Sequence, residues 1–296
     1  MRDVRIRIET EDAERASRWY SDVLAWEPLD FSPEEGWVLL RMTGGDHALL
    51  ANRDAWVKAA GRWASPAVRR LEPGERLYLS LPEEGDAALN RLEARLQAAG
   101  AKYRDESEPG CWRTLAVDLP EGGIAAYWQE LFPPMEDIVE MFADGPGRLE
   151  SLLSDLEDHA LDWRLTADSW SIRQQVLHLV DLELAALHKL KFALSSPERG
   201  VEYIGPSFHQ DAWAEGMNYG ERPVAAEVQL FRHVREHVLS VCRHVPGALG
   251  RSVRTKGGRE ESAGRLMKMM AGHANVHLRR IAEIRTRHGL PPREGG

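Results

Sequence analysis

The change of hydrophobic period at Pro133-Pro134 constrains the fold more than any other feature of the sequence. Before the two prolines, short runs that alternate apolar and polar residues surround two helical stretches, whereas almost no period-two signal follows them. Adjacent prolines interrupt both helices and strands, and a chain of 296 residues is long enough for two domains. We therefore expect an α+β protein with one domain over residues 1–132 and another over residues 137–290.

The first half contains the same order of elements twice. An alternating run at residues 4–8 precedes a helical pattern at 11–24, and a second run at 76–81 precedes a helical pattern at 86–99 that ends before Gly100. Strand-like runs then follow each helix, at residues 37–40, 47–50, 114–117 and 124–128. This repetition predicts an internal duplication of a βαβββ unit.

The second half is predicted to be an all-α antiparallel four-helix bundle. Helical periodicity covers residues 135–160, 171–194, 223–245 and 261–288. Ser171 and Gln174 have the spacing of a capping box at the start of the second helix. The connection at residues 195–222 is long for a bundle, and long loops in compact domains often cover a functional site.

The last predicted helix carries two histidines, His273 and His277, on its apolar face. Imidazoles at positions i and i+4 project side by side and can share one metal ion. The alternative is that both rings are core residues with hydrogen-bonded neighbours. His233 and His237 have the same spacing on the third helix, but they lie at the flank of its apolar stripe, which indicates a solvated pair.

Segment 170–179 (WSIRQQVLHL) resembles the opening of the second helix in DinB/YfiT-like proteins, and His273-x-x-x-His277-x-x-x-Ile281 resembles their last helix. Leu278 and Arg280 replace an arginine and a glutamine of the family pattern. Over residues 137–288, the resemblance implies a four-helix bundle that holds one divalent metal ion through three histidines. Carried over by position, the ligands are His178, His273 and His277, and Zn, Ni, Fe and Mn all accept such a set.

The position of His178 leaves two alternatives open. On a helical wheel His178 lies away from the apolar stripe of its helix, on a more polar face with Asp181 and Ala185. Either that face lines a polar cavity, or His178 is exposed and the third ligand is missing. The wheel favours exposure, whereas the resemblance favours the cavity, and we follow the resemblance.

The duplicated βαβββ pattern resembles the glyoxalase/bleomycin-resistance/extradiol-dioxygenase superfamily, the vicinal oxygen chelate fold. The matching segments include 19–24 (WYSDVL), 96–101 (LQAAGA) and 118–123 (DLPEGG). The metal-ligand positions of that superfamily correspond here to Arg5, Arg76 and Ala126. Arginine remains protonated, so we expect no metal in this domain.

The duplication relates Arg5 to Arg76, which suggests that both side chains face one cleft. Two guanidinium groups there, with tryptophans nearby, could bind a flat anionic ligand. The alternative is that both arginines extend into solvent. Either way, the domain is expected to bind a small molecule without a metal, as resistance-type members do, or to serve as a scaffold.

The resemblance to DinB/YfiT-like proteins implies a metal-dependent transferase or hydrolase that acts on a small electrophile, by thiol S-transfer or by hydrolysis, in detoxification. A thiol would have to be a low-molecular-weight cosubstrate, because neither Cys111 nor Cys242 is placed to act as the nucleophile. The alternative is a non-catalytic small-molecule-binding protein that serves in resistance or stress.

The composition excludes some partners. A net charge of −9 disfavours nucleic acid, and no signal peptide or membrane-spanning run is visible. With only two cysteines and no membrane partner expected, we predict a cytoplasmic protein. Met267, Met269 and Met270 are candidates either for the bundle core or for a homodimer contact.

Overall fold

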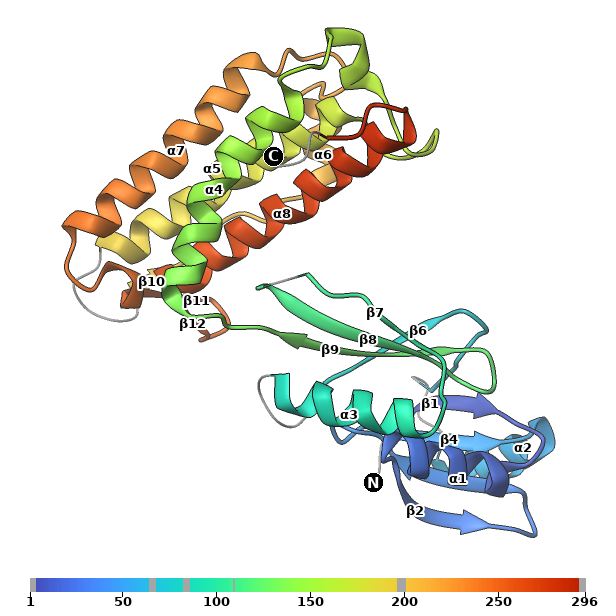
Figure 1. Ribbon diagram of the computed structural model, residues 1–296. Helices are drawn as coiled ribbons and strands as arrows, with labels where there is room; N and C mark the ends of the chain where they lie inside the picture. The colour runs from blue at the N-terminus through green and yellow to red at the C-terminus, as the bar shows by residue number, and fades with distance from the viewer. Residues whose placement is uncertain (1–3, 64–67, 82–85, 109, 196–200, 293–296) are drawn as a thin grey trace. The chain divides into compact units, whose positions relative to one another are not determined.

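The computed structural model describes residues 4–63, 68–81, 86–108, 110–195 and 201–292. The chain divides into two compact units, residues 1–132 and 133–296. The first unit contains two β-sheets with helices, and the second is mainly helical (Figure 1). The predicted α+β class is therefore confirmed.

Both predicted copies of the βαβββ unit are present in the first unit. The first copy consists of β1 (Val4–Glu9), α1 (Ala13–Leu24), β2 (Glu27–Ser32), β3 (Trp37–Arg41) and β4 (His47–Ala51). The second consists of β6 (Arg76–Leu79), α3 (Asp86–Ala98), β7 (Tyr103–Asp105), β8 (Trp112–Asp118) and β9 (Ile124–Glu130). The strand orders β2-β3-β4-β1 and β7-β8-β9-β6 are equivalent, and in each copy the first strand pairs in parallel with the last. The shared topology confirms the duplication.

A helix and a short strand between the two copies were not predicted. They are α2 (Arg53–Trp63) and β5 (Arg69–Arg70), and β5 extends the first sheet beside β1. Ala55 of α2 is buried against the first sheet, and Arg7 of β1 lies 4.8 Å from the centre of the Trp56 ring. The helix therefore covers one face of that sheet.

The two copies share one hydrophobic core, which contains buried residues of α1, α3 and both sheets. At its centre the Trp26 indole N–H donates a 2.9 Å hydrogen bond to the Tyr127 hydroxyl, and Trp26 stacks on Tyr20 at 4.7 Å. Because Trp26 and Tyr127 belong to different copies, the hydrogen bond joins the two halves of the duplication. A shared core makes the unit a single folding domain.

Four long helices form the second unit, in the order that the sequence predicts. They are α4 (Met135–Leu153), α5 (Ile172–Ser195), α7 (Ala225–His244) and α8 (Ala263–Arg287). The first helix ends earlier than expected, and the 3-10 helix η1 (Asp158–Asp162) follows it. At the start of α5, the Ser171 amide donates to Gln174 Oε1 and the Gln174 amide donates to Ser171 Oγ, as in a capping box.

Short elements occupy the connections of the bundle. They are β10 (Val201–Tyr203), α6 (Gln210–Gly216), η2 (Ala248–Gly250), β11 (Ser252–Thr255) and β12 (Glu260–Ser262). The three strands form one sheet in the order β10-β11-β12. The long connection at 195–222 thus contains β10 and α6, while residues 196–200 of it lie outside the described residues.

A buried ion pair crosses the interior of the bundle. Arg235 of α7 donates to Glu183 of α5 at 2.8 Å, and each side chain is 1% exposed. The Arg235 Nη1 atom also donates to the Phe142 carbonyl of α4 at 2.8 Å. Pro146 lies one turn after Phe142 and has no N–H, so this carbonyl lacks its helical donor and the arginine supplies one.

The methionines of the last helix divide between core and surface. Met267 and Met270 are fully buried in the bundle, whereas Met269 is 42% exposed. Within the part of the chain that the structure describes, no helix has the length and apolar character needed to cross a membrane.

Candidate metal centre

Three histidines from two helices meet inside the bundle. His178 lies on α5, and His273 and His277 lie one turn apart on α8. The Nε2 atom of His273 is 3.0 Å from that of His178 and 2.9 Å from that of His277. The potential ligand atoms of all three rings lie within 4.8 Å of one another. The structure thus brings together the three histidines that the resemblance implies.

The hydrogen bonds of the rings test whether this set suits a metal ion. The Nδ1 atom of His277 is 2.5 Å from Gln175 Oε1, an acceptor, so Nδ1 carries the proton and Nε2 presents its lone pair. The three Nε2 atoms then lie close together around one point. A neutral imidazole has a single N–H group, so each ring can donate a hydrogen bond to at most one neighbour. Among the residues that the structure describes, the Nδ1 atoms of His178 and His273 are buried and have no hydrogen-bond partner. A cation that accepts three nitrogen lone pairs fits this arrangement.

Burial keeps all three rings neutral. His178 is 3% exposed, and His273 and His277 are partly buried. The pKa is lowered to about 4 for His178, about 3 for His277 and about 2 for His273, mainly by burial and, for the last two, also by neighbouring imidazoles. Because only a neutral imidazole binds a metal, the set is in its ligating form at neutral pH.

The structure resolves the two alternatives for His178 in favour of burial. The polar face of α5 is covered, because Trp170 lies 4.8 Å and Phe208 lies 5.6 Å from the His178 ring, between ring centres. Asp181, on the same face, is buried and accepts a 2.5 Å hydrogen bond from Tyr219. A helical wheel identifies only the apolar stripe of α5. The more polar side of this helix, which carries His178 and Asp181, is also buried by neighbouring residues.

The rival histidine pair lies at the surface, as expected. The side chain of His233 is 70% exposed, and His237 is exposed and lies 3.0 Å from Lys191, between His237 Nε2 and Lys191 Nζ. Neither cysteine belongs to the histidine cluster, because Cys111 is in the other unit and Cys242 lies near the end of α7, where burial raises its thiol pKa. Among the described residues, the cluster of potential ligands thus consists of the three histidines and includes no thiol.

Several residues of the site were missed by sequence reasoning. Gln175 lies one turn before His178 on the same helix, and this spacing could have suggested it as a partner of a ligand. Phe208 and Tyr219 come from the connection between α5 and α7, and their contacts depend on how that connection folds back. The sequence carries no signal for those contacts beyond the length of the loop.

The two arginines predicted to bind an anion lie on different sheets of the first unit. Arg5 of β1 forms an ion pair with Asp46, and Arg76 of β6 forms a bidentate pair with Glu106 at 2.6 and 2.7 Å. Each guanidinium therefore already has a carboxylate partner, and Ala126 is buried in β9. Anion binding by Arg5 and Arg76 stays a prediction.

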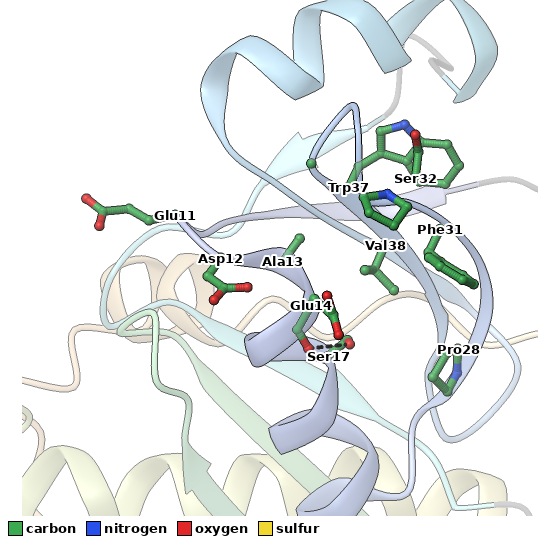
Figure 2. A pocket seen from close by; sticks show the side chains of 12 residues that line it. Glu11, Asp12, Ala13, Glu14, Ser17, Pro28, Phe31, Ser32, Trp37 and Val38 are labelled. Carbon is green, nitrogen blue, oxygen red and sulfur yellow. Dashed lines mark hydrogen bonds between the residues drawn. The ribbon is translucent and has the colours of Figure 1, made fainter.

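A cavity of about 380 Å³ lies elsewhere in this unit, between the start of α1 and the β2–β3 hairpin. Figure 2 shows Asp12 and Glu14 on its α1 side and Phe31 and Trp37 on its sheet side. Neither Arg5 nor Arg76 lines it. The Asp12 carboxylate also caps α1 by accepting from the Arg15 amide at 2.9 Å.

Comparison with known proteins supports the resemblance of the helical unit. The model of the DinB superfamily matches residues 141–281. A "Putative metal-dependent hydrolase" of Halalkalibacterium halodurans is 26% identical over 145 residues, which are 48% of this chain and 82% of that protein. The DinB resemblance of the C-terminal half is thereby confirmed, and each of the matching relatives carries the name "Putative metal-dependent hydrolase".

Solved structures resemble each half of the chain. YfiT from Bacillus subtilis, which has a four-helix bundle, is 18% identical with a TM-score of 0.47, and the match covers 52% of this chain and 87% of YfiT. A glyoxylase/bleomycin resistance protein/dioxygenase domain from Frankia sp. EAN1pec is 21% identical with a TM-score of 0.32, over 42% of this chain and 88% of that domain. The strand order of the two sheets, rather than these scores, supports the predicted fold of the N-terminal half.

Proposed function

We propose that His178, His273 and His277 hold one divalent metal ion and that the helical unit is a metal-dependent hydrolase of a small electrophile. The convergence of three Nε2 atoms carries this proposal. A divalent ion supplies Lewis acidity, which polarises the bond to be cleaved and lowers the pKa of a water molecule. Three protein ligands are the usual number for a catalytic site of this kind, because a further position is then free for substrate or water.

The chain's own residues hold the imidazoles ready for this task. Gln175 fixes the tautomer and orientation of His277, so its lone pair already points to the common focus. Burial keeps the rings uncharged, and the aromatic side chains beside His178 limit the access of water. The site is therefore organised before any ion arrives.

Hydrolysis is the reaction that the named relatives favour, and thiol S-transfer is the second candidate. Because neither cysteine belongs to the site, transfer would require an external low-molecular-weight thiol. Turnover of one electrophile with and without added thiol separates the two reactions. The non-catalytic alternative, a small-molecule-binding or resistance protein, predicts that neither reaction occurs.

Metal analysis of the purified protein tests the proposal. We expect one equivalent of metal per chain in the wild type and a loss of at least tenfold in occupancy in His273→Ala. His233→Ala is the matched control, because His233 belongs to an i, i+4 pair on an exposed face of α7 and should leave the metal content unchanged. Equal metal content in His273→Ala and the wild type would contradict the proposal, as would a wild type without metal after loading.

A further inference from the structure

An aromatic surface lies beside the three histidines, and the proposed hydrolase function does not account for it. The Trp170 ring packs edge-on against His178, with 4.8 Å between ring centres, and Phe208 approaches the same ring at 5.6 Å. Trp213 of α6 lies 4.6 Å from Phe208. We call Trp170, Phe208 and Trp213 the aromatic wall.

The wall is not part of the hydrophobic core of the bundle. The core clusters of the helical unit contain many buried residues of α5 and α8, yet none of the three rings belongs to them. Trp170 and Phe208 are only partly buried, and Trp213 is 36% exposed. Large aromatic side chains left partly open to solvent forgo burial that would stabilise the fold, which is typical of binding surfaces.

The position of the wall relates it to the histidines. Phe208 and Trp213 lie in the connection between α5 and α7, on either side of the start of α6, so this connection brings two of the rings to the triad. Tyr219, further along, is fully buried and donates to Asp181 of α5 at 2.5 Å. That hydrogen bond ties the connection to α5 one turn after His178, and it holds the wall in place.

We propose that the substrate carries an aryl group, which stacks on the aromatic wall while its reacting group lies at the three imidazoles. This assignment rests on the proposed function, because it names the chemical group by which that same site recognises its substrate. An aryl group can make offset or edge-on contacts with the rings of the wall. A short alkyl chain gains little from such contacts.

Two chelating probes that differ only in this group test the proposal. Acetohydroxamate and benzohydroxamate present the same metal-binding atoms, with a methyl group on one and a phenyl group on the other. Their dissociation constants are measured on the full chain loaded with one equivalent of Co²⁺, from the change in its visible absorption. Ring stacking predicts that benzohydroxamate binds about tenfold more tightly to the wild type.

Variants identify the residue responsible for the difference. Phe208→Leu keeps an apolar side chain but removes the ring, so the tenfold preference should fall to about threefold or less. Phe192→Leu is the matched control, because Phe192 is an exposed ring on α5 about 21 Å beyond His178 by helical rise. The preference should be unchanged in Phe192→Leu, and Trp213→Leu provides a second variant of the wall.

The outcomes separate this proposal from the one on which it rests. If both hydroxamates bind the cobalt-loaded wild type equally well, the aryl proposal is wrong and the metal site stands. If the preference survives in Phe208→Leu, Trp213→Leu and Trp170→Leu alike, the wall is likewise not its source. If the protein binds no cobalt, the metal site itself fails, and the aryl assignment fails with it.

Discussion

The ring of His277 is held by the side-chain amide of Gln175, with 2.5 Å between His277 Nδ1 and Gln175 Oε1. Gln175 is 7% exposed, so the contact is shielded from water. Since the amide oxygen can only accept, it selects the tautomer whose Nε2 lone pair faces His273. Of the three imidazoles, His277 is the one whose outer nitrogen has this support, because within the described part of the chain the Nδ1 atoms of His178 and His273 have no hydrogen-bond partner.

Removal of this support should weaken metal binding without removing a ligand. Gln175→Leu leaves the His277 Nδ1 proton without an acceptor, and loss of such a partner typically costs about 10–100-fold in metal affinity. Competition against a chelator of known affinity measures the change. Gln175→Glu is the control, because a carboxylate oxygen also accepts from Nδ1, and it should retain most of the affinity. Identical dissociation constants for wild type and Gln175→Leu would show that the contact does not position the ligand.

The sequence predicts the long elements well, because their periodicity reflects which faces are buried. The alternation in β1 and β6 corresponds to buried residues of one core, and the helical patterns of α5 and α8 correspond to buried residues of the two core clusters of the bundle. Short elements such as α2 and the β10-β11-β12 sheet were missed. The three strands span too few residues to show a period, and they pair with segments that are distant in sequence.

The candidate site could be predicted only in part for a similar reason. Spacing on one helix indicates that His273 and His277 are neighbours, whereas nothing local relates either of them to His178, 95 residues away from His273. The resemblance to DinB-like proteins provided that third position, against the helical wheel. The spacing of Gln175 and His178 hints at a ligand partner, but the contact of Gln175 with His277 and that of Phe208 with His178 depend on how α5, α8 and the connection to α7 pack together.

The metal-free protein should lose stability in mild acid. The pKa of His178 is about 4 in the folded chain and those of His277 and His273 are about 3 and about 2, whereas a histidine in an unfolded chain has a pKa near 6.5. The unfolded state therefore binds protons first as the pH falls. The contribution of these groups is fully present above about pH 6.5 and decreases below it, by up to about 1.4 kcal/mol per pH unit for each ring.

Urea unfolding of the chelator-treated protein between pH 7.5 and 5 measures this dependence. His178→Leu should give a shallower slope, because one of the three rings no longer titrates on unfolding, and its apolar side chain suits the buried position. Parallel dependences for the variant and the wild type would mean that His178 is not held neutral by the fold.

Two glycines of α4 should respond in opposite ways to the same substitution. A Cβ at Gly145 would lie 2.2 Å from Arg235 Nη1, the atom that donates to the Phe142 carbonyl, whereas a Cβ at Gly147 meets no atom within 4 Å. Gly147→Ala should stabilise the protein by about 0.5–1 kcal/mol, since alanine loses less backbone freedom in a helix. Gly145→Ala should destabilise it, because Arg235 cannot keep both the carbonyl and Glu183 when its guanidinium is displaced.

The expected loss for Gly145→Ala follows from the burial of the ion pair. The side chains of Arg235 and Glu183 are each 1% exposed. Removing one partner of a buried ion pair lowers the free energy of unfolding by about 3–5 kcal/mol. In Gly145→Ala the arginine is displaced but still paired, so the loss should be about 1–3 kcal/mol. Chemical denaturation of both alanine variants measures the two effects under one condition. If Gly145→Ala were as stable as Gly147→Ala, the close approach of Arg235 to α4 would not constrain residue 145. The Arg235 side chain would then be able to keep its ion pair with Glu183 in a different conformation.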